Sequence, residues 1–218
     1  MSKTLLEPGC RVSPAPAVIL SCKNGDKTNL ITVAWTGNIC SEPAMAYVSI
    51  RPGRYSYKLV KESGEFVLNL CDASMVKAVD ICGAYTGSRT DKWKKAGLTP
   101  EQASKVDAPL IKESPVSIEC KVKEIIPLGS HDLFIGEVVA VDAAESLIDE
   151  YGRFRPENAG ILSYTGNGYM AAGEKLAEKG FSVRRKSSGD RRKTGNFSKR
   201  KTPSGEMNSP VRDGGMGD

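Results

Sequence analysis

The most constraining feature of this sequence is a series of short runs of β-branched and other apolar residues. Each run is bounded by Gly, Pro, Asn or Asp, which is typical of β-strands that end in turns. The runs are too short for most buried helices, so the series predicts a mainly β chain. The predicted strands are 17–22, 30–35, 44–50 and 65–70.

Two longer segments, 116–126 and 132–142, extend this pattern. The first alternates polar and apolar residues, which indicates a strand with one buried face. The turn 127–130 separates the two segments, so they are predicted to form an antiparallel hairpin. A last, shorter hairpin is predicted for 161–164 and 169–171 around the turn 165–168.

Only two helices are predicted. Residues 55–63 precede Gly64, and glycine is favoured just after a helix end because it adopts a positive φ. Residues 73–82 follow Asp72, a good N-cap, and are expected to end at Gly83. Many short strands with few helices favour a β-barrel or a β-sandwich.

Charge divides the chain into two parts. Residues 182–218 hold ten Lys/Arg and four Asp/Glu, a formal charge of +6, whereas the whole chain carries +5. This Gly- and Ser-rich segment has one aromatic residue and cannot bury enough apolar surface to offset its ordering entropy. We therefore predict a folded domain over 1–185 and a basic, disordered tail over 186–218.

The tail has two functional interpretations besides that of a dispensable, solvated extension. Its basic clusters could contact the phosphates of a nucleic acid or an acidic protein partner. Nucleic-acid binding is the less favoured of the two, because only Phe197 is available for stacking on bases. The basic clusters are 184–186, 191–193 and 199–201.

Several function classes lose support from what the sequence lacks. His131 is the one histidine, so a site that needs two histidines is excluded. There is no CxxC pair, no GxGxxG after the first strand and no GxxxxGK[ST], which argues against zinc-ribbon, Rossmann and P-loop proteins, and we expect no metal site. No apolar run is long enough to span a membrane and no export signal is visible, so a cytoplasmic location is expected. The six cysteines are then expected to be reduced and to be small buried hydrophobes.

The densest polar segment before the tail lies between a predicted strand and a predicted helix. It combines two arginines and two hydroxyl groups with the free N–H groups of a helix start, which suits a phosphate. The alternative is an ordinary strand-to-helix turn with solvated arginines. The candidate residues here are Ser49, Ile50, Arg51, Arg54, Tyr55 and Ser56.

Three further places could contribute to the same site. The Trp35 ring, flanked by small and hydroxyl side chains, could border a flat ligand, although a buried core tryptophan is the commoner case. His131 has the pKa range for proton transfer, although a histidine in a turn is more often structural. Lys92 could place a cation beside a reducible ring, although its basic segment could simply be solvated.

The residues of these segments, in this order, resemble one known family. The strings TVAWTG, SEP and SIRPGRYSYKLVKESGEFVLN, followed by DKW, APLIKESPVSIECKV, LGSHDLFIGEVVAV and GFSVR, are similar to flavin reductase-like proteins of the FMN-binding split-barrel superfamily. The flavoredoxin branch is the nearest in pattern. The resemblance covers roughly residues 8–185 and excludes the tail.

The resemblance implies a six-stranded Greek-key split β-barrel that binds FMN at the interface of a homodimer. Two positions differ from the usual family pattern: Ser56 stands where Thr is common, and Tyr164 stands where Phe is common. By resemblance, His131 and Lys92 would be the catalytic residues. The expected cofactor-binding set is Asn29, Thr32, Ala34, Trp35, Thr36, Cys40, Ser49, Ile50, Arg51, Arg54, Tyr55, Ser56, Lys92, His131 and Tyr164.

The leading functional hypothesis is an FMN oxidoreductase. It would be either an NAD(P)H-dependent flavin reductase or a flavoredoxin-type electron carrier reduced by another redox protein. The alternative is a binding module in which the barrel is a scaffold and the basic tail contacts the partner. Split-barrel pyridoxamine phosphate oxidases and haem binders share the expected fold but fit the quoted motifs less well.

Overall fold

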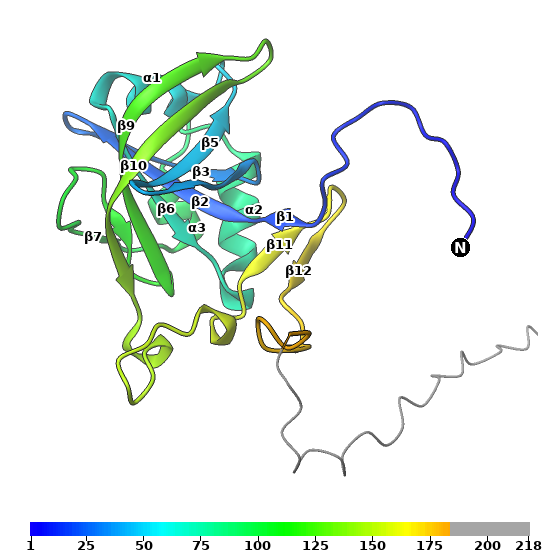
Figure 1. The fold of residues 1–218 in the computed structure, drawn as a ribbon. Coiled ribbons are helices and arrows are strands. Elements are labelled where there is room, and N and C mark those ends of the chain that lie inside the picture. Colours follow the sequence, from blue (N-terminus) through cyan, green and yellow to red (C-terminus); the bar gives the residue numbers. More distant parts are fainter. Residues whose placement is uncertain (184–218) are drawn as a thin grey trace, which may run out of the picture. The chain divides into compact units, whose positions relative to one another are not determined.

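The computed structural model describes residues 1–183. Its main element is a seven-stranded sheet with the strand order β3-β2-β6-β9-β10-β5-β4, in which every neighbouring pair is antiparallel (Figure 1). The strands are β2 (Val18–Asn24), β3 (Lys27–Val33), β4 (Thr36–Ser41), β5 (Ala44–Ile50), β6 (Glu65–Leu70), β9 (Val116–Pro127) and β10 (Asp132–Ala143).

The sheet curls around one apolar core, as expected for a split barrel. In β2, Val18 and Leu20 face this core, while Ile19 faces the opposite side, because successive side chains of a strand alternate between faces. Phe66 and Phe134 are its largest side chains, and neither is exposed. The prediction of a mainly β split barrel is confirmed.

The split lies between β3 and β5, which have no ladder between them in the described residues. A backbone hydrogen bond of 2.9 Å from the Ser49 N–H to the Trp35 carbonyl links the two sides near the strand ends. Strand β4 adds a seventh strand outside β5 and was not predicted from the sequence. Its residues are mostly polar and exposed, so they lack the apolar run that identified the other strands. Trp35 lies in the turn between β3 and β4 and not in the predicted strand 30–35.

Helix α1 (Tyr55–Ser63) connects β5 to β6 and packs against β2 and β3. Its bounds are those predicted, and Gly64 ends it with a φ of 71°. The crossover carries the chain from one side of the sheet to its middle, and it brings the first turn of α1 beside β3 (Figure 1).

A second apolar layer covers the outer face of β2 and β3. It contains the short 3₁₀ turn η1 (Ala73–Met75), α2 (Val76–Ala84) and α3 (Lys92–Ala96). The Asp72 side chain caps η1 by accepting from the Ser74 N–H at 2.9 Å. The predicted helix 73–82 was wrong at its end, because α2 runs through Gly83 to Ala84. Helix α3 is too short to have been recognised.

The remaining elements complete the described chain. Strands β9 and β10 form the predicted long hairpin, and β11 pairs with β12 as predicted. Strand β1 adds to β11, so the small second sheet has the order β1-β11-β12. The other elements are β1 (Ala15–Pro16), β7 (Pro100–Glu101), β8 (Leu110–Ile111), η2 (Glu145–Leu147), η3 (Pro156–Asn158), β11 (Leu162–Tyr164) and β12 (Tyr169–Ala171).

The chain separates into a compact unit, Met1–Lys175, and a second unit that begins at Leu176. Of the second unit the structure describes only residues up to Val183, of which 179–183 form turns. The predicted tail, 186–218, lies outside the described residues. In the described part of the chain, no helix has the length and apolar character needed to cross a membrane.

Candidate functional site

A polar pocket lies at the first turn of α1. Asn29 from β3 donates from Nδ2 to the Ser56 Oγ at 2.7 Å, and both residues are almost completely buried. The first N–H groups of a helix have no intrahelical acceptor, and Arg54 at the N-cap supplies no capping side-chain bond. The Tyr57 N–H donates to the Arg54 carbonyl at 3.0 Å, so the N–H groups of Tyr55 and Ser56 and the Ser56 hydroxyl hydrogen remain available to an anionic ligand.

Lys92 belongs to this polar pocket. Its ammonium group donates to the carbonyls of Leu30 and Cys82, each at 2.8 Å, although the residue is only 4% exposed. An ammonium has three N–H donors, so one is left over for a ligand. Burial lowers the pKa of Lys92, and the nearby charge of Arg54 lowers it further. A bound anion would offset part of this cost.

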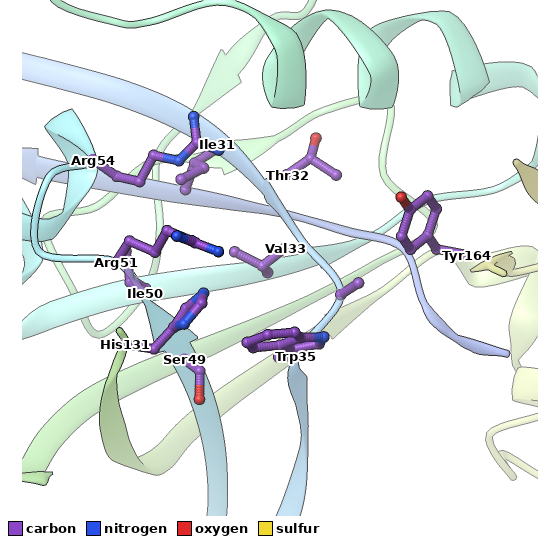
Figure 2. Close-up of a pocket in the computed structure, with 11 residues that line it drawn as sticks. Ile31, Thr32, Val33, Trp35, Ser49, Ile50, Arg51, Arg54, His131 and Tyr164 are labelled. Carbon is purple, nitrogen blue, oxygen red and sulfur yellow. The ribbon is translucent and has the colours of Figure 1, made fainter. Parts of the chain in front are cut away.

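The second part of the site is a groove of about 240 Å³ over the split between β3 and β5. Ile31 and Val33 provide an apolar floor, and Arg51 and Arg54 reach in from the β5–α1 connection (Figure 2). Figure 2 shows Tyr164 on the opposite side of the groove from the two arginines.

Trp35 and His131 form one wall of this groove. Their ring centroids are 4.4 Å apart, and Trp35 remains 43% exposed despite this contact. Burial, together with the positive charges of Arg51 and Arg54, lowers the pKa of His131 and so favours its neutral ring. The adjacent Asp132 accepts a hydrogen bond of 2.6 Å from the Tyr57 hydroxyl, which ties the start of β10 to α1.

A third pocket of about 330 Å³ lies beyond Thr32 and Ala34. It is bordered by Tyr164 and Tyr169, whose rings form a tilted pair with centroids 5.7 Å apart. The Tyr164 hydroxyl, which a phenylalanine at this position would lack, donates to the Gly166 carbonyl at 2.7 Å. It is therefore held within the β11–β12 turn.

The three pockets adjoin one another. The groove shares Arg54 with the polar pocket, which holds about 180 Å³, and it shares Thr32, Ala34 and Tyr164 with the third pocket. A continuous site thus runs from a cationic end to an aromatic end. Together these volumes fall in the range of about 300–1,000 Å³ that is usual for ligand sites.

Most of the predicted binding residues meet in this site. The two exceptions are Thr36, whose hydroxyl donates to the Tyr47 carbonyl, and Cys40, whose exposed thiol lies near the Glu42 carbonyl; neither lines the three pockets. The binding roles of the others remain predictions. The expectation that all six cysteines are buried was wrong for Cys10 and Cys40, which are exposed.

The sequence interpretation missed several lining residues. Ile31 and Val33 were read only as strand residues, and the loop after α2 carried no recognised motif. Gly87 in that loop lies so close to Asn29 that an added Cβ would be 2.0 Å from the amide oxygen. A short TGS sequence gives no signal of such a contact. The other missed residues are Ala17, Gly53, Asp80, Gly83, Ala84, Tyr85, Thr86 and Tyr169.

Comparison with known proteins identifies the family. The model of the flavin reductase-like domain matches residues 10–172, which is more than half of the chain. The chain belongs to the flavin reductase-like family. The predicted family, including its flavoredoxin branch, is confirmed, and the flavin reductase-like protein is a flavin-related oxidoreductase with a flavin cofactor.

Individual relatives agree with this assignment. A flavoredoxin of Desulfovibrio vulgaris is 30% identical with a TM-score of 0.78, over 84% of this chain and 100% of that chain. An FMN-binding protein of Thermus thermophilus with bound 1-cyclohex-2-enone is 26% identical with a TM-score of 0.69, over 82% and 98%. An NADPH-flavin oxidoreductase of Streptomyces viridifaciens is 24% identical over 131 residues, which cover 59% of this chain and 66% of that protein.

The donor set of the continuous site fits a flavin nucleotide. The polar pocket offers uncapped helix amides, a buried hydroxyl and a buried ammonium to a phosphate. The groove offers an apolar floor and aromatic walls to a flat ring. Phosphate-binding and ring-binding features are therefore arranged in one line.

Proposed function

We propose that this flavin reductase-like protein binds FMN and transfers electrons from a reduced donor to an acceptor. The observation that supports this most directly is the buried Asn29–Ser56 hydrogen bond beside Lys92 at the uncapped start of α1. This cluster matches a phosphate monoester, and the adjoining groove has the apolar floor that a flavin ring needs.

In this proposal, the protein contributes binding, orientation and charge. Ser56, Arg54 and Lys92 hold the phosphate, while Trp35 and His131 form a wall beside the ring. The isoalloxazine ring of bound FMN supplies the redox chemistry itself. The location of Lys92 in the polar pocket, away from Trp35 and His131, favours phosphate binding over the catalytic role expected for it.

Two kinds of electron donor are candidates, NAD(P)H and another redox protein. The NADPH-flavin oxidoreductase among the relatives supports NAD(P)H, whereas the flavoredoxin supports an electron carrier that another redox protein reduces. We also propose a homodimer, because the groove is open and Trp35 remains exposed beside it.

An absorbance spectrum of the purified full-length chain, with and without added FMN, is the first test. We expect a flavin band that remains with the protein after gel filtration. Anaerobic addition of NADH or NADPH then separates the two donors, because rapid bleaching indicates a nicotinamide-dependent reductase. A persistent band that bleaches only with a reduced redox protein indicates the carrier.

A chain that stays colourless after addition of FMN would contradict this proposal. The binding-module alternative would then be preferred, and it predicts nucleic-acid binding that weakens steeply with salt.

A further inference from the structure

The third pocket, beyond Thr32 and Ala34, has a lining unlike that of the rest of the site. In the proposed function, the phosphate and the ring of FMN lie in the polar pocket and the groove, so this space of about 330 Å³ is left for another molecule. Arg51 and Arg54 border the groove, whereas Asp80 is the one charged residue among the described residues that border the third pocket. The charge of the site thus changes sign along its length.

The hydroxyl groups around the third pocket are already used as donors within the protein. Thr32 and Tyr164 donate to backbone carbonyls at 2.5 and 2.7 Å. The Tyr169 hydroxyl donates to the Asp80 carboxylate at 3.3 Å. Among the described residues, no side chain that borders the pocket therefore keeps an O–H or N–H donor for an anionic ligand.

The pocket offers negative charge instead. Asp80 is exposed and forms no ion pair in residues 1–183, and the Tyr169 hydroxyl occupies only its Oδ1. Asp80 belongs to α2, whose C-terminal residues Gly83 and Ala84 also border the pocket. The C-terminal end of a helix carries partial negative charge, and the last turn of α2 has no basic residue of its own to offset it. Both features favour a cation.

Two aromatic rings lie beside this carboxylate. The rings of Tyr164 and Tyr169 are tilted by 45° with their centroids 5.7 Å apart, and protein acceptors hold both hydroxyls. The rings themselves therefore remain for a ligand. A cation is attracted to the face of an aromatic ring within about 6 Å of the centroid. The other lining residues include Ala17 and Ala34, against which a flat apolar group can pack.

We propose that the third pocket binds an organic cation with a flat apolar body, of the class of protonated arylalkylamines, beside the flavin ring. This inference rests on the proposed function, because it gives the chemical class of a second ligand next to bound FMN. Benzylammonium has the required features. Benzyl alcohol and benzoate keep its ring while the charge is removed or reversed, so the three molecules form a matched series of probes.

The test measures the binding of the three probes to the full-length chain saturated with FMN, by isothermal titration calorimetry at neutral pH and fixed ionic strength. Asp80→Asn removes the carboxylate charge and keeps an acceptor for the Tyr169 hydroxyl. Glu124→Gln removes the same charge from an exposed position on β9 that borders none of the three pockets. Tyr169→Leu removes a ring, whereas Tyr169→Phe keeps it.

We expect benzylammonium to bind at least tenfold more tightly than benzyl alcohol, and benzoate to bind most weakly. Asp80→Asn should weaken benzylammonium binding on the order of tenfold, and Tyr169→Leu should weaken it about threefold. The control variants Glu124→Gln and Tyr169→Phe should each change it less than about twofold.

Equal affinities for the three probes, or equal losses in Asp80→Asn and Glu124→Gln, would overturn the inference. Benzylammonium that binds only in the absence of FMN would also overturn it, because the flavin itself would then occupy the third pocket. Failure of every protein to bind FMN overturns the proposed function instead. The comparison of Asp80→Asn with Glu124→Gln in the FMN-free chain then still decides whether the pocket selects a cation.

Discussion

At the residue scale, the site depends on polar side chains that are buried and yet only partly satisfied by the protein. Ser56 accepts from Asn29 and has a hydroxyl hydrogen left, while Lys92 has one N–H left after its two carbonyl partners. A buried donor without an acceptor is costly, so these groups favour a ligand with acceptor oxygens. Two variants separate their contributions.

Ser56→Ala removes both the donor to the phosphate and the acceptor for Asn29. Because a hydrogen bond to a charged group contributes about 1.5–3 kcal/mol, we expect the FMN dissociation constant to rise at least tenfold. Equilibrium dialysis with flavin absorbance measures this. Ser56→Thr keeps the hydroxyl and should retain most of the affinity; equal losses in both variants would contradict a hydroxyl contact.

Lys92→Met keeps the length of the side chain but removes its charge. If Lys92 holds the phosphate, we expect FMN affinity to fall by at least tenfold while the midpoint potential of residual bound FMN stays nearly constant. A spectroscopic redox titration measures the midpoint potential. A lowered potential with unchanged affinity would instead support the catalytic position beside the reduced ring.

A second buried polar cluster bears on stability and not on the flavin site. The fully buried Glu119 carboxylate accepts from the backbone N–H groups of Ser104, Lys105 and Val106, which fastens the loop before β8 to β9. The Asp142 carboxyl lies beside it with one buried oxygen, Oδ2, that has no hydrogen-bond partner in the described residues. Burial, and then the neighbouring Glu119, raises the pKa of Asp142, while these N–H donors lower that of Glu119.

Asp142→Asn should therefore change how stability depends on pH. A raised carboxyl pKa means that the folded state binds the proton more tightly, so this contribution to stability is lost as the pH rises above 3.8 and through the folded value. The variant lacks this loss. We therefore expect its free energy of unfolding, minus that of the parent, to be larger at pH 8 than at pH 5. Urea titrations at the two pH values measure the difference. A constant difference would show that Asp142 is not held protonated.

At the element scale, the site is assembled where α1, β3 and the loop after α2 meet. Helix α1 supplies its first turn, β3 supplies Asn29, and the loop supplies Gly87 against that amide. Gly87 is needed because any side chain would occupy the space of the Asn29 amide. The loop thus fixes the amide orientation from outside the strand.

Gly87→Ala tests this contact. The added Cβ would be 2.0 Å from the Asn29 Oδ1, so the amide or the loop must move. We expect FMN affinity to fall about tenfold and stability to fall by about 1–3 kcal/mol, the usual cost of overpacking. Thermal unfolding and FMN titration measure both. Gly173→Ala, where a Cβ would meet nothing within 4 Å, is the matched control; equal effects in the two variants would exclude a role for the Asn29 contact.

At the scale of the whole molecule, the open side of the groove bears on the oligomeric state. A flavin ring bound over Ile31 and Val33 would keep one side exposed unless a second chain covers it. We therefore expect the FMN-loaded protein to have a mass of about twice 23.4 kDa by light scattering. A monomer that retains FMN would contradict a dimer built around the groove.

Most of the strand series, helix α1 with its end at Gly64, and the family could be predicted from the sequence. These features are local, since they depend on side-chain alternation, turn residues and contiguous motifs. It also predicted Ser56 and Arg54 as phosphate-binding candidates, because a strand followed by arginines, hydroxyls and a helix start is a local pattern, and both residues line the pockets. Strand β4 was missed because its exposed polar residues are held by pairing with β5 rather than by an apolar pattern of their own.

The residues that share the site could be recognised only from the folded chain. Asn29, Ser56, Gly87 and Lys92 come from four separate segments, and their contacts depend on how α1 and the α2 layer pack on β3. Likewise, nothing local places Lys92 in the polar pocket beside Ser56 or leaves Thr36 and Cys40 outside the pockets. Such contacts arise from long-range packing, which residue spacing along the chain does not encode in any local pattern.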